Sequence, residues 1–72
     1  MKTYVFGNEK YVTVHDAAND IGTSRQVLMR WLRRLDIPHQ VVTQGQKSVA
    51  TFFLFSAMTQ LRRYGRPRLR VG

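Results

Sequence analysis

Residues 12–34 read Val12-Thr13-Val14-His15-Asp16-Ala17-Ala18-Asn19-Asp20-Ile21-Gly22-Thr23-Ser24-Arg25-Gln26-Val27-Leu28-Met29-Arg30-Trp31-Leu32-Arg33-Arg34. Two segments of this run have the apolar spacing of amphipathic helices. We expect the first helix over about residues 14–20, with Thr13 as its N-cap and Asp16 as the reciprocal partner of a capping box. Gly22 then supplies the turn, because glycine adopts backbone conformations that other residues avoid. The run therefore predicts two short helices joined by a tight turn.

A second helix is predicted over about residues 24–35, apolar on one side and basic on the other. Thr23 or Ser24 is placed to cap its N-terminus. The positions that follow helical spacing on its apolar side are Val27, Leu28, Trp31, Leu32 and Leu35. We expect Trp31 in the core, where it would hold this helix against the hairpin that follows. Two helices joined in this way predict a helix-turn-helix, whose second helix fits the major groove of DNA.

β structure is predicted on both sides of this helical pair. Residues 3–6 and 10–12 are β-favouring runs around a turn-prone Gly7-Asn8-Glu9, so we expect an N-terminal strand or small hairpin. Residues 40–43 and 49–55 predict a second hairpin with a polar tip over residues 44–48. In the run of Phe52, Phe53, Leu54 and Phe55, alternation places at least one pair in the core.

A third helix is predicted after the second hairpin. Ser56 resembles its N-cap, Met58, Leu61 and Tyr64 would face the core, and Gly65 marks its end. The expected fold class is α+β, with one folded domain over residues 1–64. Residues 65–72 lack any periodicity and are expected to form a basic flexible tail.

Charge is the strongest feature of the composition. The 72 residues include 12 lysines and arginines against 4 aspartates and glutamates, a net charge of +8. Such an excess attracts polyanions, so nucleic acid is the leading partner class and an anionic membrane surface the second. There is no cysteine, which excludes disulfides and thiolate-bound zinc. No run approaches the roughly 20 apolar residues of a membrane span, so we expect a soluble cytoplasmic protein.

The polar side of the second helix carries the candidate binding residues. Arg25, Met29 and Arg33 share one side at i, i+4 spacing, with Gln26 and Arg30 adjacent. Arginine can grip guanine through paired donors and glutamine can pair with adenine, whereas Arg33 and Arg34 are better placed for phosphates. A merely solvated charged surface is the alternative, but this helix lacks the carboxylates that normally pair with its arginines.

The sequence contains no residue pattern typical of a catalytic or metal site. Its four carboxylates are scattered, and Asp16 and Asp36 are explained by the helix ends. His15 and His39 lack the spacing of metal ligands and stand beside no evident nucleophile. We therefore expect no enzyme activity, no cofactor and no bound metal.

The order helix, turn, helix, hairpin, helix resembles the winged helix-turn-helix of the MerR-like superfamily, in its small phage and mobile-element form. The resemblance covers roughly residues 11–64. It rests on Tyr11-Val12-Thr13-Val14, Ala17-Ala18, Ile21-Gly22-Thr23-Ser24-Arg25-Gln26, Leu28, Arg30-Trp31-Leu32, Ile37-Pro38 and Phe53-Leu54-Phe55-Ser56. It implies a bacterial or phage-encoded, nucleoid-associated protein. The residues it implies on or beside the DNA-facing surface are Ser24, Arg25, Gln26, Met29, Arg30, Arg33 and Arg34.

Two further basic elements are candidates for contacts with DNA. Lys47 at the predicted hairpin tip would enter a minor groove or touch a phosphate, unless the tip is an ordinary polar turn. Gly65-Arg66-Pro67 with Arg68 resembles the core of an AT-hook, in which extended arginines occupy a narrow A·T minor groove. Generic electrostatic contact is the alternative for Arg66 and Arg68.

Together these observations predict a sequence-specific, double-stranded DNA-binding protein. A phage-type transcriptional regulator and an excisionase or architectural recombination factor share the same surface. A module this small would gain specificity from self-association on adjacent DNA sites, or from an integrase or another protein partner. The alternatives are an RNA-binding adaptor and a protein-docking adaptor that use the same basic surface.

Overall fold

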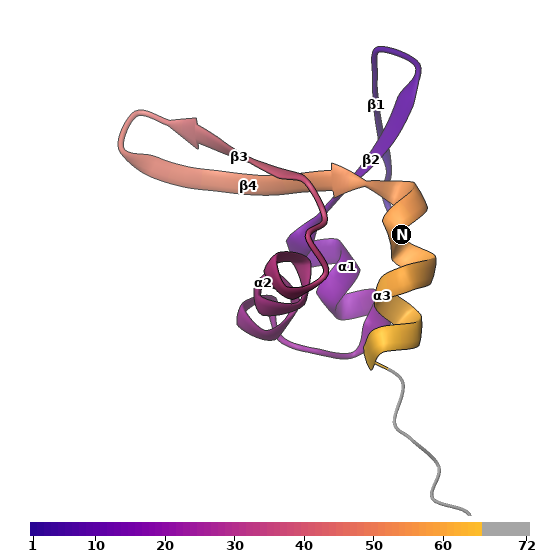
Figure 1. Ribbon diagram of the computed structural model, residues 1–72. Helices are drawn as coiled ribbons and strands as arrows, with labels where there is room; N and C mark the ends of the chain where they lie inside the picture. Colours follow the sequence, from indigo (N-terminus) through magenta and orange to yellow (C-terminus); the bar gives the residue numbers. More distant parts are fainter. Residues whose placement is uncertain (66–72) are drawn as a thin grey trace, which may run out of the picture.

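The computed structural model describes residues 1–65, apart from the side chain of Ser48, and these form a small α+β fold. The element order is β1 (Tyr4–Phe6), β2 (Glu9–Thr13), α1 (Val14–Ile21), α2 (Arg25–Arg34), β3 (His39–Gln44), β4 (Lys47–Leu54), a 3-10 turn (Phe55–Ala57) and α3 (Met58–Gly65). Figure 1 shows the helices gathered below an antiparallel sheet. Residues 66–72, with the predicted Arg66 and Arg68 contacts, lie outside the described residues.

The turn between α1 and α2 is built by the predicted residues. Thr13 Oγ1 accepts a hydrogen bond from the Asp16 amide at 3.2 Å and so caps α1. Gly22 has a φ of 86° and its amide donates to the Ala18 carbonyl, which ends the helix in a left-handed conformation. Ser24, rather than Thr23, caps α2. α1 is one residue longer than predicted because this closure allows Ile21 to remain helical.

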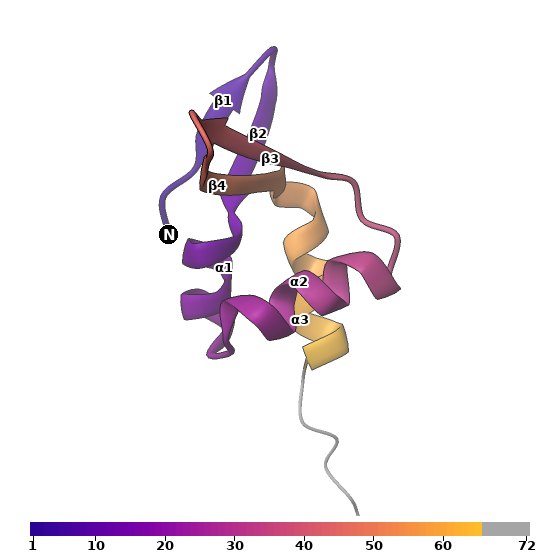
Figure 2. The same ribbon diagram turned by 90° about the vertical axis from the view of Figure 1, so that its left-hand side faces the viewer.

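The two hairpins join into one sheet, which the sequence analysis did not predict. The strand order is β1-β2-β4-β3, and the junction pairs Val12 with Phe53. The predicted five-residue polar tip is wrong, since Gln44 pairs with Lys47 and leaves a two-residue turn. Gly45 has a φ of 65° in that turn, a conformation that favours glycine. The hairpin β3–β4 is therefore longer and tighter than expected. It extends beyond the helices in Figure 1 and points toward the viewer in Figure 2.

The core lies between one face of the sheet and the three helices. The sheet contributes Val12 and Phe53, which oppose each other across β2 and β4. The buried helical residues are Val14, Ala17, Ala18, Leu28, Leu32, Met58 and Leu61. Phe55 packs half-buried against this cluster. The predicted core role of Met58 and Leu61 is confirmed, as is the alternation that buries Phe53.

Trp31 does not hold α2 against the hairpin, contrary to the prediction. The side chain is half-buried and packs against α3, where its ring centroid lies 5.7 Å from that of Tyr64. Trp31 lies beside Leu28 at i, i+3 spacing on the apolar side of α2, packs at the margin of the core and reaches Gly65 at the end of α3. Tyr64 is 43% exposed, so it covers the indole without entering the core. Trp31 thus fastens α2 to α3.

The predicted N-cap Ser56 is also wrong. Ser56 is exposed in the middle of the 3-10 turn, and Leu54 is the residue before that turn. No side chain caps the turn at Leu54, because β4 runs directly into it. The 3-10 turn continues into α3, so the chain enters the helix from a tighter helical turn and not from a capped start.

Gly65 makes the close approach between α2 and α3 possible. A methyl group added at this position would lie 2.4 Å from Cη2 of Trp31. We expect Gly65→Ala to lower the free energy of unfolding by about 1 kcal/mol, because the clash costs about 1–3 kcal/mol and alanine recovers part of that through its helix propensity. Thermal denaturation measures the loss. In a Trp31→Leu background Gly65→Ala should cost nothing, and an equal cost in both backgrounds would contradict the contact.

Candidate nucleic-acid interface

The exposed side of α2 forms a shallow hollow. Leu28 and Leu32 are completely buried beneath the helix, so the residues on its opposite side face solvent. The side chains that line the hollow are Arg25, Gln26, Met29, Arg30 and Arg33. All but Met29 are exposed; Met29 is half-buried and also packs on the core. Five of the ten predicted binding residues are thus brought together on one surface, which we call the α2 surface.

No carboxylate lines the α2 surface. Asp20, at the end of α1, forms an ion pair with Arg62 of α3 at 2.5 Å. Asp36 follows α2 with a φ of 56°, a left-handed conformation. Asp16 lies in the first turn of α1, and Glu9 opens β2. Asp16 shares a neighbouring hollow with Arg25, and Asp36 shares another with Arg33. Among residues 1–65, however, no carboxylate forms an ion pair with an arginine of the α2 surface, and Arg62 serves α1–α3 packing.

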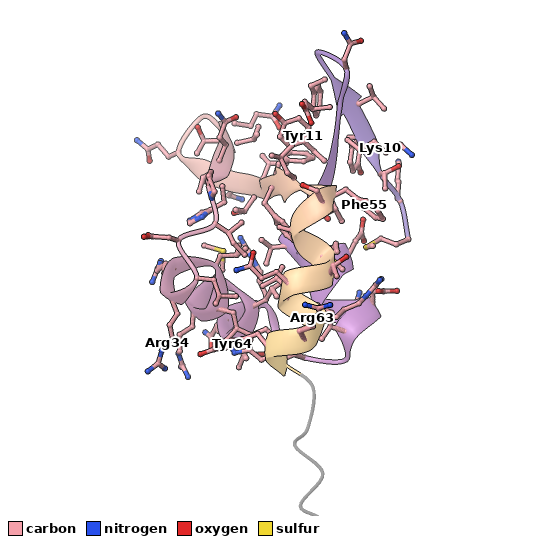
Figure 3. The ribbon with its side chains drawn as sticks, turned by 45° about the vertical axis from the view of Figure 1, so that its right-hand side comes forward. Lys10, Tyr11, Arg34, Phe55, Arg63 and Tyr64 are labelled. Carbon is pink, nitrogen blue, oxygen red and sulfur yellow. The ribbon has the colours of Figure 1, made fainter. Side chains whose placement is uncertain are left out.

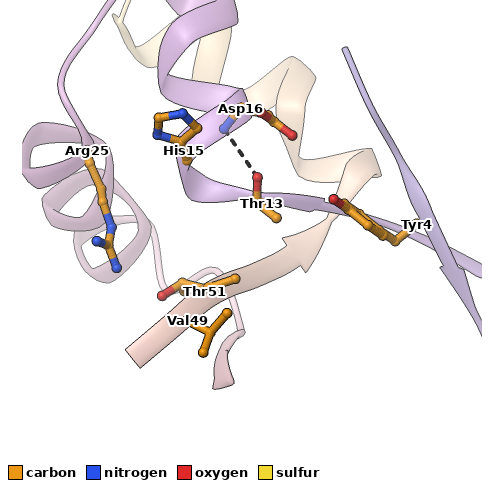
Figure 4. Close-up of a pocket in the computed structure, with 8 residues that line it drawn as sticks. Tyr4, Thr13, His15, Asp16, Arg25, Val49 and Thr51 are labelled. Atoms are coloured by element: carbon orange, nitrogen blue, oxygen red, sulfur yellow. Dashed lines mark hydrogen bonds between the residues drawn. The ribbon is translucent and has the colours of Figure 1, made fainter. Parts of the chain in front are cut away.

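A second hollow adjoins the start of α2 (Figure 4). It lies where β4 continues beyond the end of β2, and it is lined by Tyr4, Thr13, His15, Asp16, Arg25, Val49, Ala50 and Thr51. Arg25 lines both hollows. His15 is exposed, and its Nε2 lies 3.5 Å from Nδ2 of Asn19. His15 had no predicted role, because its proximity to Arg25 and β4 arises only from the turn at Gly22 and the β2–β4 pairing.

Three other predicted binding residues within residues 1–65 do not line the hollow on α2: Ser24, Arg34 and Lys47. Ser24 Oγ accepts a hydrogen bond from the Val27 amide at 3.2 Å, so its first role is to cap α2. Arg34 is exposed at the end of α2 and does not line the hollow; Figure 3 shows its side chain pointing outward. Lys47 is exposed beside the hairpin turn, well beyond the helices. Only an extended partner could contact Arg34 or Lys47 and the α2 surface at the same time.

The two roles of Ser24 can be separated by substitution. We expect Ser24→Ala to lower the free energy of unfolding by about 1 kcal/mol, the typical cost of a lost N-cap. Ser24→Asp keeps the cap and should preserve stability, while its charge beside the arginines weakens binding of polyanions. Thermal denaturation and DNA titration of both variants measure this, and an unchanged melting temperature for Ser24→Ala would contradict the capping role.

Other kinds of site are not evident among residues 1–65. Within this range no three histidines or acidic residues converge in a way that could hold a metal ion. None of the helices between Val14 and Gly65 is both long and apolar enough to cross a bilayer. The α2 surface therefore stands out by its charge and by its convergence of hydrogen-bond donors.

Comparison with known proteins found no matching family model, curated protein or solved structure.

Proposed function

We propose that this protein is a winged helix-turn-helix module that binds double-stranded DNA in a sequence-specific way. The observation that carries the proposal is the α2 surface, where Arg25, Gln26, Arg30 and Arg33 converge without a carboxylate. Arginine and glutamine are the side chains that form paired hydrogen bonds with guanine and adenine in the major groove. The buried Leu28 and Leu32 hold α2 with its basic side exposed, and an α-helix has the dimensions to enter that groove.

In this proposal the pair α1–α2 is the helix-turn-helix and the hairpin β3–β4 is the wing. The hairpin extends on the side of the molecule where α2 lies (Figure 1), so Lys47 and Arg34 would reach phosphates on either side of the site. Arg25, between the two hollows, would contact the backbone or a base at the start of α2. Neutralised phosphates would supply much of the affinity and make it sensitive to salt.

The protein would act by occupying or shaping DNA, without chemistry of its own. Both a transcriptional regulator and an excisionase or architectural factor work in this way. A single module buries little surface, so useful specificity would require several copies, a protein partner or bent DNA.

NMR titration of the isotope-labelled protein tests the proposal directly. On adding a duplex, we expect the largest amide shifts in residues 24–34 and near Lys47, with little change in α3. An equal titration with an RNA hairpin serves as the comparison. Stronger shifts with the RNA would favour an RNA-binding adaptor, and shifts confined to α3 would contradict the assignment of α2.

A further inference from the structure

The face of the sheet turned away from the helices carries an apolar strip across all four strands. Residues opposite each other in antiparallel strands share a face, so the register places Tyr4, Tyr11 and Leu54 together. Alternation along the strands adds Phe6, Phe52 and Val42. We call this set the outer strip; its members are Tyr4, Phe6, Tyr11, Phe52, Leu54 and Val42. None belongs to the core cluster or lines the hollow on α2.

The aromatic side chains of the outer strip pack on one another. Tyr4 contacts Phe52 edge to face with ring centroids 5.2 Å apart, and Phe6 contacts both Tyr11 and Phe52 at 5.6 and 5.9 Å. This packing leaves much apolar surface uncovered, since Phe6 is 55% exposed and Val42 is 44% exposed. In Figure 1 no helix lies over this side of the sheet. An exposed, ordered aromatic cluster of this kind is typical of an interaction surface.

Two opposite charges flank the aromatic cluster. The Lys2 ammonium lies 5.2 Å from the centre of the Tyr4 ring, and Glu9 pairs with Phe6 at the other end of the β1–β2 hairpin. Both residues are exposed, and neither forms an ion pair within residues 1–65. Lys10 belongs to the opposite face because it pairs with Val5. The outer strip thus contains no charged side chain on a chain of net charge +8, and one cationic and one anionic side chain flank it.

The geometry points to a second copy of this chain as the occupant of the outer strip. In a two-fold symmetric contact the same patch meets itself, and residues at its two ends exchange partners. Stacking Tyr4 and Tyr11 of one copy on those of the other would bring Glu9 beside Lys2 of the second copy, twice in each dimer. The apolar strip supplies the buried surface, and the two ion pairs fix the orientation.

The charges and ring geometry favour this occupant over others. A strongly acidic partner would gain from Lys2 but would be repelled by Glu9. Single-stranded nucleic acid needs open ring faces for base stacking, whereas Tyr4 lies beneath Lys2 and the other rings meet at steep angles of 57° to 90°. A second copy satisfies both charges at once. The inference is independent of the proposed function, because the outer strip and the α2 surface have no residue in common.

Sedimentation velocity of the DNA-free protein over a range of concentrations tests the inference. We expect a monomer–dimer equilibrium whose dissociation constant rises at least about tenfold in Phe6→Ser, since truncating a central aromatic removes much of the binding energy. Val5→Ser is the matched control, because Val5 is 65% exposed on the other face of the same strand. This control should leave the dimer unchanged, and circular dichroism checks that both variants fold.

Charge reversal tests the orientation of the two copies. Glu9→Lys and Lys2→Glu should each weaken the dimer about three- to tenfold, whereas the double variant should restore it to within about twofold. A protein that stays monomeric at every concentration would overturn the inference. A dimer that is unaffected by Phe6→Ser would also overturn it, as would a double variant that does not restore the dimer. A monomer that binds a single-stranded oligonucleotide and loses this binding in Phe6→Ser would overturn it in favour of nucleic acid.

Discussion

Replacing Phe53 with alanine is expected to remove a large part of the protein's folding stability. Phe53 is 1% exposed and joins β4 and β2 to the helices at the centre of the core. Its truncation should cost about 3–5 kcal/mol, the usual range for a fully buried phenylalanine. A domain of 72 residues has a total stability of only about 4–11 kcal/mol. Urea denaturation followed by circular dichroism measures the loss.

Phe52 provides the control for this prediction, because it differs from Phe53 only in the face of the sheet that it occupies. Phe52 is half-buried in the outer strip, so Phe52→Ala should cost clearly less than Phe53→Ala. Equal losses from the two substitutions would show that the assignment of the two faces of β4 is wrong.

The second large effect is expected at Arg30, on the α2 surface. Arg30 is exposed and lines the hollow, pointing away from the buried leucines. If it reads a base, Arg30→Ala should weaken binding to the specific duplex by about ten- to a hundredfold and binding to a random duplex by only a few fold. Stability should be unchanged. Titrations of both duplexes at one salt concentration measure the two effects.

Arg63→Ala is the matched control for Arg30→Ala, since it removes the same charge from the exposed side of α3 (Figure 3). It should weaken both duplexes slightly and equally, through the general electrostatic attraction. Equal losses on both duplexes for Arg30→Ala would instead assign Arg30 to a phosphate and transfer base reading to Gln26 or Arg25.

Local signals in the sequence were sufficient for α1, α2 and the turn between them. The Thr13 and Ser24 caps, the turn at Gly22 and the apolar sides of the helices all involve residues close in sequence. Hydrogen bonds over three or four residues are set by side-chain type and spacing. For the same reason the exposed side of α2 could be assigned from periodicity, and the structure brings five of its residues together.

Contacts between distant residues could not be predicted in the same way. The pairing of β2 with β4 brings Val12 to Phe53, and nothing in either strand alone specifies that partner. Trp31 was assigned to the core because it follows the apolar spacing of the helix, but the placement of α3 puts it at the margin of the core against Tyr64. The outer strip and the neighbourhood of His15 arise from the same distant pairings, so neither was predicted.

The central claim, that the α2 surface reads duplex DNA, is tested most directly by fluorescence anisotropy. Labelled duplexes from the DNA around the protein's own gene are compared with a scrambled duplex at several salt concentrations. The claim predicts that one native fragment binds at least roughly a thousandfold more tightly than the scrambled duplex and that this preference survives moderate salt. Equal and steeply salt-dependent binding to every duplex would contradict it, and would leave only a nonspecific polycation.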